Sequence, residues 1–127
     1  MQPVNLFNLA AQQARWLSVR QSVIAGNVAN VNTPGYVARD VKPFEAVLDN
    51  RHVAMAATEP GHMQGNNPLV QDVSLREDNE NPVVLPSGNT VSLQTELVKS
   101  ADVQRQFNLN TAIVKAFHNM LAMATKE

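Results

Sequence analysis

Apolar residues recur near the start of the chain at steps of three, four and seven positions. They are Leu6, Leu9, Ala10, Trp16, Leu17, Val23, Ile24, Val28 and Val31. Because an α-helix completes a turn every ~3.6 residues, this spacing predicts a helix over residues 5–31. Gln13 and Arg20 fall on the same stripe. They lie either at the margin of the helix seam, which we favour, or within it, where they would set the register against a partner helix.

A second long helical pattern covers residues 92–125, and Ser92 is suited to its N-cap. One apolar stripe of this segment contains Leu93, Leu97, Phe107, Val114, Phe117 and Leu121, and a second contains Leu109, Ile113, Ala116, Met120 and Met123. A helix that is apolar on more than one face must be buried on more than one face. Since one partner helix covers one stripe, we expect further neighbours.

The segment between the helices, residues 37–91, has a different composition. It holds five of the seven prolines of the chain, Pro43, Pro60, Pro68, Pro82 and Pro86. Residues 82–91, centred on Ser87-Gly88-Asn89, predict a small β-hairpin. Residues 49–81 have weak periodicity and predict an irregular loop, which is uncommon at that length in a compact domain.

The expected fold is therefore mainly α, with two long terminal helices in an antiparallel, coiled-coil-like hairpin. Residues 1–36 and 92–127 are expected to form one discontinuous helical domain, joined by residues 37–91 as an irregular segment. We expect the ends to be partly disordered in a free monomer and to fold on docking. Either a closed bundle or dimer, or an open filament of head-to-tail contacts, would cover the surplus apolar face.

Composition narrows the class of protein. The chain has 127 residues, with 10 basic and 11 acidic residues and no cysteine. The length fits one domain, the balanced charge argues against a nucleic-acid partner, and the lack of cysteine excludes disulfides and thiolate metal sites. No apolar run approaches the ~20 residues of a membrane span. No basic segment followed by an apolar block marks a cleaved signal peptide.

Candidate catalytic and metal-binding side chains do not converge in the sequence. Glu59 and His62 lie close across a turn but lack a third ligand. His118, within the second helix, is expected to pack either as a partly buried core histidine or as a contact between subunits. Asp40 and Glu45 are too isolated to act as a carboxylate pair.

The remaining acidic and histidine residues also do not predict a catalytic or metal-binding site. Glu77, Asp78 and Glu80 predict a solvated acidic loop, and His52 stands alone in an irregular segment. No glycine-rich phosphate loop is present. We therefore expect no enzymatic activity, no catalytic residue, no cofactor and no metal site.

The first helix ends in a run of helix-breaking residues, Asn27-Val28-Ala29-Asn30-Val31-Asn32-Thr33-Pro34-Gly35-Tyr36. Asn tolerates left-handed backbone, which suits a helix C-terminus. Pro34 cannot continue a helix and Gly35 allows positive φ, so Pro-Gly predicts a tight turn. Asn27 and Asn30 share a helix face, and their amides are expected to bond free carbonyls or a neighbour's backbone. The run predicts a fixed elbow after the helix.

Residues 27–44 resemble the N-terminal motif of bacterial flagellar rod and hook proteins. The matching positions are Asn27, Ala29, Asn30, Thr33, Pro34, Gly35 and Tyr36. Ala38-Arg39-Asp40 followed by Phe44 is similar to the proximal rod subunit of that family. Ser87-Gly88-Asn89-Thr90-Val91 leads into the second helix as in that subunit. The resemblance covers residues 6–48 and 86–121.

The resemblance implies a structural subunit of the proximal rod of the flagellar basal body. Such subunits assemble helically, link the membrane-embedded ring and export gate to the distal drive shaft, and transmit torque across the periplasm. The implied partners are further copies of the chain, other rod proteins, the rod–ring adaptor FliE and the flagellar type III export apparatus, which exports its substrates without cleavage. Phe44-Glu45-Ala46-Val47-Leu48 is similar to a motif attributed to rod and hook export substrates.

Two sets of residues are expected to carry assembly. The turn motif comprises Asn27, Ala29, Asn30, Thr33, Pro34, Gly35, Tyr36, Arg39 and Asp40, and the assembly helix contributes Phe107, Ile113, Val114, Phe117, Met120 and Leu121. Arg39 and Asp40 are expected to form ion pairs between subunits.

Two alternatives remain open. A sibling flagellar axial subunit would share the N-terminal motif but differ in its C-terminal helix. A helical adaptor unrelated to flagella would explain the helices but not the Asn-rich elbow.

Overall fold

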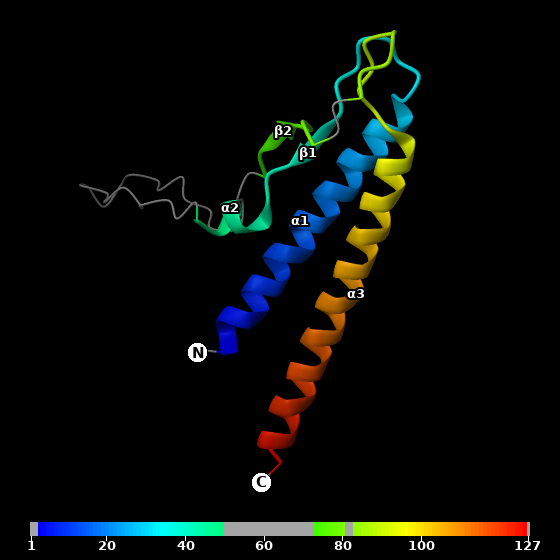
Figure 1. Cartoon of the computed structure of the whole chain (residues 1–127). Coiled ribbons are helices and arrows are strands. Elements are labelled where there is room, and N and C mark those ends of the chain that lie inside the picture. The colour runs from blue at the N-terminus through cyan, green and yellow to red at the C-terminus, as the bar shows by residue number, and fades with distance from the viewer. Residues whose placement is uncertain (1–2, 50–72, 81–82, 127) are drawn as a thin grey trace, which may run out of the picture.

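The computed structural model describes residues 3–49, 73–80 and 83–126. Two long helices dominate it, α1 (Pro3–Ala29) and α3 (Leu93–Ala124). They lie side by side and antiparallel, so that the start of α1 and the end of α3 are at the same end of the hairpin (Figure 1). The predicted mainly α fold, built on an antiparallel helical hairpin, is confirmed.

The observed helix boundaries lie within two residues of the predicted ones. α1 ends before residue 31 because the amide of Asn30 already bonds to the carbonyls of Gly26 and Asn27, at 3.2 and 3.1 Å, which tightens the last turn. Ser92 takes the predicted N-cap position, and its carbonyl accepts the amide of Glu96 at 3.0 Å. The side chain of Ser92 makes no capping hydrogen bond.

A small lobe lies beside α1 and contains β1 (Arg39–Val41), α2 (Phe44–Asp49) and β2 (Leu75–Glu77) (Figure 1). The two strands pair antiparallel, with Asp40 opposite Arg76. The lobe therefore joins two segments that are more than thirty positions apart in the sequence.

Trp16 anchors this lobe on α1. Its indole nitrogen donates a hydrogen bond to the carbonyl of Lys42 at 2.8 Å, and its ring centroid lies 5.9 Å from that of Phe44. Phe44 and Val47 are partly buried against the core, so the aromatic and one aliphatic side chain of the segment from 44 to 48 pack within the fold.

The small sheet does not lie where the sequence predicts it. Residues 83–91 contain no strand and form a turn, in which the amide of Leu85 bonds to the carbonyl of Asn89 at 2.9 Å. The prediction of an irregular loop over residues 49–81 is wrong at β2, and residues 50–72 and 81 lie outside the described residues. The division into a helical domain and a connecting segment stays a prediction.

The apolar core of the hairpin is small. Its buried side chains are Trp16, Leu17, Ile24, Val41 and Val103. Near the ends of the helices that carry the chain termini, the rings of Phe7 and Phe117 meet edge to face with centroids 5.4 Å apart. These contacts fix the two helices against each other, but they occupy only part of the seam.

Polar side chains fill other positions of the seam. Asn110 of α3 donates hydrogen bonds to the carbonyl of Ala10 at 2.9 Å and to the side chain of Gln13 at 3.2 Å. Arg20 lies 3.9 Å from the carboxylate of Asp102. Gln13 and Arg20 therefore make polar contacts across the seam. This supports the interpretation that they set its register, rather than the favoured one, in which they lie at its margin.

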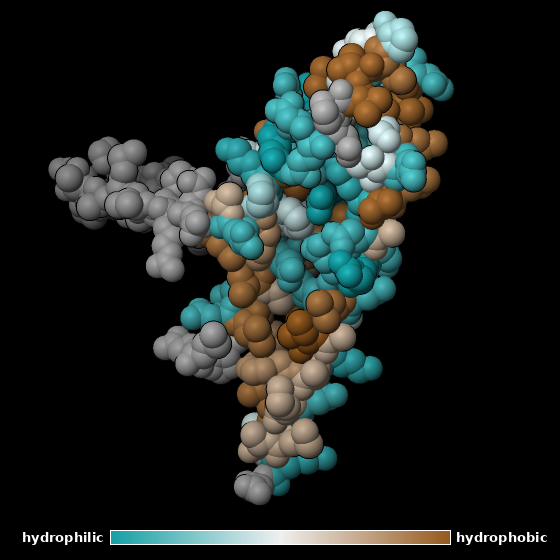
Figure 2. All heavy atoms as spheres, in the orientation of Figure 1, coloured by the Kyte–Doolittle hydropathy of each residue, from teal (hydrophilic) through white to brown (hydrophobic). Residues whose placement is uncertain are grey.

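Large apolar side chains of α3 remain exposed, as its two stripes predict. They are Leu93, Leu97, Val98, Phe107, Leu109, Ile113, Met120 and Met123. Val114, Phe117 and Leu121 are partly buried, so the first stripe divides between the two environments. Figure 2 shows apolar surface along the lower half of the hairpin. Among the described residues, no helix is both long and apolar enough to cross a membrane.

Replacing Leu17 by Ala should lower the free energy of unfolding by roughly 2–5 kcal/mol, because the side chain is fully buried between the helices and its loss leaves a cavity. Urea unfolding of the full chain, followed by far-UV circular dichroism, measures this change. Leu97→Ala is the matched control, since that side chain is 60 % exposed, and it should change stability by no more than about 0.5 kcal/mol. Equal effects of the two substitutions would contradict the packing described.

Candidate functional site

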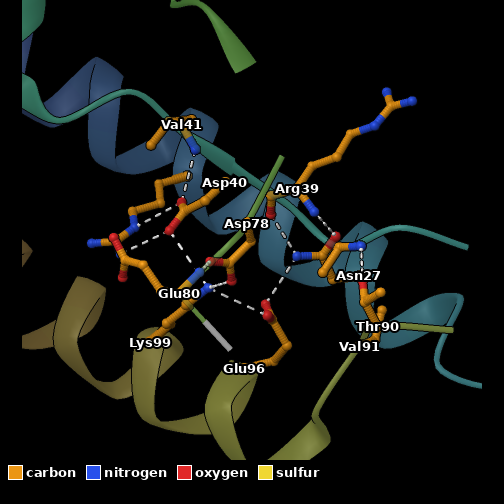
Figure 3. Close-up of polar contacts among 12 residues, drawn as sticks. Asn27, Arg39, Asp40, Val41, Asp78, Glu80, Thr90, Val91, Glu96 and Lys99 are labelled. Carbon is orange, nitrogen blue, oxygen red and sulfur yellow. Dashed lines mark hydrogen bonds and ion pairs between the residues drawn. The ribbon is translucent and has the colours of Figure 1, made fainter. Parts of the chain in front are cut away.

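The side chain of Asn27 is fully buried in the last turns of α1 and makes four hydrogen bonds. Its Nδ2 donates to the carbonyl of Arg39 at 2.7 Å and to the carboxylate of Glu96 at 3.1 Å. Its Oδ1 accepts the amide of Arg39 at 3.1 Å and the hydroxyl of Tyr36 at 3.3 Å. Asn27 thus pairs with the backbone of Arg39 as a neighbouring strand would. It ties α1, β1 and α3 together at one point (Figure 3).

The predicted tight turn is confirmed. The amide of Tyr36 bonds to the carbonyl of Thr33 at 3.3 Å, and Gly35 has φ +72°. None of these asparagines uses the left-handed backbone that the residue tolerates, because Gly35 and Gly88 are the only described residues with positive φ. The asparagines act through their side chains instead. Asn30, for example, donates its amide to the carbonyl of Gly26 at 2.8 Å.

Asn89, which the sequence reasoning did not single out, holds the turn that follows α1. Its Nδ2 lies 2.9, 3.0 and 2.8 Å from the carbonyl oxygens of Asn30, Val31 and Thr33, and its Oδ1 accepts the amide of Val91 at 2.7 Å. These carbonyls lie just beyond the last residue of the helix, Ala29. A buried side chain from the segment before α3 thus fixes the path of the chain as it leaves α1.

Further backbone contacts join these two segments. The amide of Gly35 bonds to the carbonyl of Ser87 at 2.9 Å, and the amide of Thr90 bonds to the carbonyl of Tyr36 at 3.1 Å. A Cβ atom on Gly88 would lie 3.4 Å from the Cα of Gly35, so the two chains pass in close contact. We call residues 27–36 and 87–91 together the elbow. The two stretches quoted for the family resemblance, on opposite sides of the long connecting segment, therefore form one structure.

Beside the elbow lies a buried charge cluster made of Arg20, Asp40, Asp78, Glu96 and Lys99. The ammonium of Lys99 donates a hydrogen bond to Asp78 and lies 3.6 Å from the carboxylates of Asp40 and Glu96. Arg20 binds both oxygens of Asp40, at 3.2 and 3.1 Å. In Figure 3 the carboxylates of Asp40, Asp78 and Glu96 come from three elements and converge on Lys99. The cluster fastens the lobe to both helices.

Two expectations about these acids are wrong. Asp40 is not free to pair with another subunit, because it is 2 % exposed and bonded within its own chain. Asp78 is buried rather than part of a solvated loop, although Glu77 and Glu80 are exposed. Lys99 brings Asp40 and Asp78 together and is distant from both in the sequence. The residues next to either carboxylate therefore give no indication of this contact.

The hydrogen bonds and charges around Asp78 and Lys99 together outweigh the effect of burial on their pKa values. Burial alone would raise the pKa of Asp78, but the hydrogen bonds from Lys99 and from the amide of Glu80 lower it below its ordinary 3.8. Burial would likewise lower the pKa of Lys99. The hydrogen bond to Asp78 and the charges of Glu96 and Asp40 raise it above its ordinary 10.5. Both groups are therefore charged at neutral pH.

The other predicted site residues lie at the surface or outside this description. Arg39 is exposed, and its guanidinium points away from the charge cluster (Figure 3). His118 is exposed on α3, so it is not a core histidine, and a contact between subunits stays a prediction, while His52 and His62 lie outside the described residues. Within the ranges that the structure describes, no three His, Cys, Asp or Glu side chains are arranged to hold a metal ion.

The sequence is similar to known flagellar proteins. Residues 9–36, which span most of α1 and the first half of the elbow, match the family described as "Flagella basal body rod protein". The chain is 45% identical over 130 residues to the "Flagellar basal body rod protein FlgB" of Agrobacterium fabrum, covering 99% of this chain and 96% of that one. It is 28% identical over 116 residues to the FlgB of Escherichia coli K12, covering 80% and 82%.

These similarities define the class as the rod proteins of the bacterial flagellar basal body, as the motif in residues 27–44 implies. Within that class, the chain belongs to the FlgB family and is a structural component of the rod. The two alternatives, a sibling axial subunit and an unrelated helical adaptor, are therefore not supported.

Asn27→Asp should lower the free energy of unfolding at neutral pH by roughly 3 kcal/mol or more. The substitution removes two donors and places a fourth carboxylate beside Glu96 in a buried site. Urea unfolding of the full chain measures the loss. Asn32→Asp, at an exposed position of the same elbow, should stay within about 0.5 kcal/mol of the parent. A mild effect at position 27 would mean that the amide does not hold the elements together.

The stability of the chain should form a plateau around neutral pH. Because the folded pKa of Asp78 lies below 3.8, its stabilising contribution is complete above that value and disappears as pH falls through the folded pKa. Lys99 acts in the opposite sense: its contribution is complete below 10.5 and is lost as pH rises through a higher folded pKa.

Denaturant unfolding from neutral pH down to about pH 2 tests the acid side of this plateau. Asp78→Asn should be less stable than the parent at neutral pH and should lose less stability on acidification. Glu77→Gln, a neighbouring exposed carboxylate, should leave the acid dependence as it is. If Asp78→Asn lost as much stability on acidification as the parent, this carboxylate would not be the cause of the acid dependence.

Proposed function

We propose that this chain assembles helically with further copies of itself and with other rod proteins, as part of the proximal rod. In this position it links the membrane-embedded ring and export gate to the distal drive shaft and transmits torque across the periplasm. Its role is mechanical rather than enzymatic. The proposed partners beyond the rod are the rod–ring adaptor FliE and the flagellar export apparatus, which would pass the chain without cleavage of a signal peptide.

The observation that carries this proposal is the exposed apolar face on the second half of α3. Leu109, Ile113, Met120 and Met123 are 59, 47, 55 and 66 % exposed. Soluble monomers rarely leave contiguous apolar surface of this kind uncovered, so it indicates an interaction site. A rod needs contacts that repeat without closing, and a subunit with one helix face used internally and another turned outward supplies them.

The predicted assembly residues divide between these two uses. Phe107, Ile113 and Met120 are exposed, and we propose that they contact neighbouring subunits. Val114, Phe117 and Leu121 are partly buried in the hairpin and support that face from behind. Residues 1–36 and 92–127 would then act as the helical domain of the rod. Their outer ends become fully ordered only on docking.

We propose that the turn motif fixes the angle between the helical hairpin and the lobe. Its residues are Asn27, Ala29, Asn30, Thr33, Pro34, Gly35, Tyr36, Arg39 and Asp40. Asn27 and Asp40 do this through buried contacts within the chain. Arg39 is the member whose charge faces outward, so it is the one we assign to a neighbouring subunit, in an exposed ion pair of modest strength.

The segment Phe44-Glu45-Ala46-Val47-Leu48 is proposed to act in export. In the folded chain it lies in α2, with Phe44 packed on Trp16. An export apparatus that takes up unfolded chains would meet these side chains before they pack.

Gly35→Val should abolish or strongly reduce motility while export of later flagellar substrates continues. A β-branched residue is strained at φ +72°, so the turn of the elbow cannot keep its shape. Swimming assays and immunoblots of the cell-free medium, in a strain that carries the variant in place of the parent gene, give the two readouts.

Gly26→Val is the matched control for this substitution. Gly26 lies in α1 and a Cβ there meets nothing within 4 Å, so motility should be retained. Normal motility in Gly35→Val would remove the elbow from the functional part of the protein.

A further inference from the structure

α3 buries polar residues against α1 and leaves a row of apolar residues uncovered. Glu96, Val103 and Asn110, spaced seven positions apart, are buried toward α1, and Val114, Phe117 and Leu121 are partly buried in the hairpin. The exposed residues on the outer face are Leu109, Ile113, Ala116, Met120 and Met123. Their steps of four and three also fit a coiled-coil seam. Apolar area alone therefore does not determine which of these two faces packs on α1.

Polar residues on α1 match those on α3 at the same spacing. Gln13, Arg20 and Asn27 lie seven positions apart, on one side of the seam. Gln13 accepts a hydrogen bond from Asn110 at 3.2 Å, and Asn27 donates one to Glu96 at 3.1 Å. Between these pairs, Arg20 lies 3.9 Å from Asp102. The partner number falls as the α1 number rises, as an antiparallel register requires.

A slip of the two helices by one heptad would break every one of these pairs. In one direction Gln13 would face Phe117 and Asn27 would face Val103. In the other, Gln13 would face Val103. Apolar positions tolerate such exchanges, because one aliphatic side chain packs against another of similar size. A buried amide that faces an aliphatic side chain loses its hydrogen bonds, and that loss opposes the slip.

We propose that these six residues, Gln13, Arg20, Asn27, Glu96, Asp102 and Asn110, determine which register and which face α3 selects. We call them the polar seam. It pairs α3 with α1 in one register and on one face, and so keeps the apolar face free. That this face then serves other rod subunits rests on the proposed function, whereas the selection of register and face does not. Single buried polar residues have this effect in coiled coils, at some cost in stability.

The chain contains no cysteine, so pairs of introduced cysteines can report the register without a background signal. Phe7→Cys with Phe117→Cys reports the observed register, since the two rings are in contact. Phe7→Cys with Ala124→Cys reports a slip of one heptad, and Phe7→Cys with Ala116→Cys reports rotation toward the outer face. Disulfide formation needs Cβ atoms roughly 4 Å apart, which separates these arrangements.

In the parent full-length chain, the 7–117 disulfide should form on the order of tenfold faster than either alternative. The double substitution Gln13→Leu with Asn110→Leu removes one polar pair far from the elbow and the charge cluster. It should retain or raise the helix content, since leucine favours burial, and should reduce the preference for the 7–117 pair, while the two remaining polar pairs keep part of it. Asn108→Leu is the matched control, because Asn108 lies on the same helix but is exposed, and it should keep the parent's preference.

Three results would overturn the inference. They are an unchanged register preference in the double variant, an equal loss of preference in Asn108→Leu, and the absence of any preference in the parent. The disulfides report pairing in the purified chain and take no reading from motility, so a failure of the rod proposal would leave their outcome unaffected.

Discussion

The buried amide of Asn27 is the constraint on which the rest of the structure depends. Its four hydrogen bonds reach the backbone of β1, the hydroxyl of Tyr36 and the carboxylate of Glu96 on α3. Each buried group left unpaired costs roughly 1–3 kcal/mol, so arrangements that separate these elements are strongly disfavoured. Glu96 in turn lies beside Lys99, which binds the acids of the lobe. One amide thus holds the hairpin, the elbow and the lobe in a common geometry.

Polar and apolar contacts have divided roles in this molecule. Inside the hairpin, amides and charges decide how the elements fit, whereas much of the apolar area of α3 faces outward. Buried ionic contacts add little net stability once their desolvation is counted, but they penalise wrong pairings. Exposed apolar surface contributes much binding free energy but discriminates little between geometries, because the hydrophobic effect is non-directional. A subunit built this way brings a defined shape to an assembly and draws much of its stability from it.

Local sequence patterns predict the parts of this structure that are local. The two helices follow from apolar spacing, and the turn follows from Pro34-Gly35, because each depends on residues close together in the chain. The lobe was not predicted, since β1 and β2 have three residues each and pair across more than thirty positions. The burial of Asp40 and Asp78 escaped for the same reason: acidic residues in a polar segment are normally solvated, and only Lys99, brought near by α3, makes burial tolerable. Asn89 stood within the stretch quoted for the family resemblance, but nothing in the sequence indicated that its side chain would reach the turn after α1.

The turn after the first helix is held from a distant part of the chain, because Asn89 is 59 positions beyond the carbonyl of Asn30 that it binds. Ribosomes deliver a polypeptide from its N-terminus. A nascent fragment that stops before residue 87 therefore contains α1 and the turn after it, but lacks the side chain of Asn89 that binds the carbonyls of that turn. Premature termination in that interval leaves the helix complete and its exit unfastened.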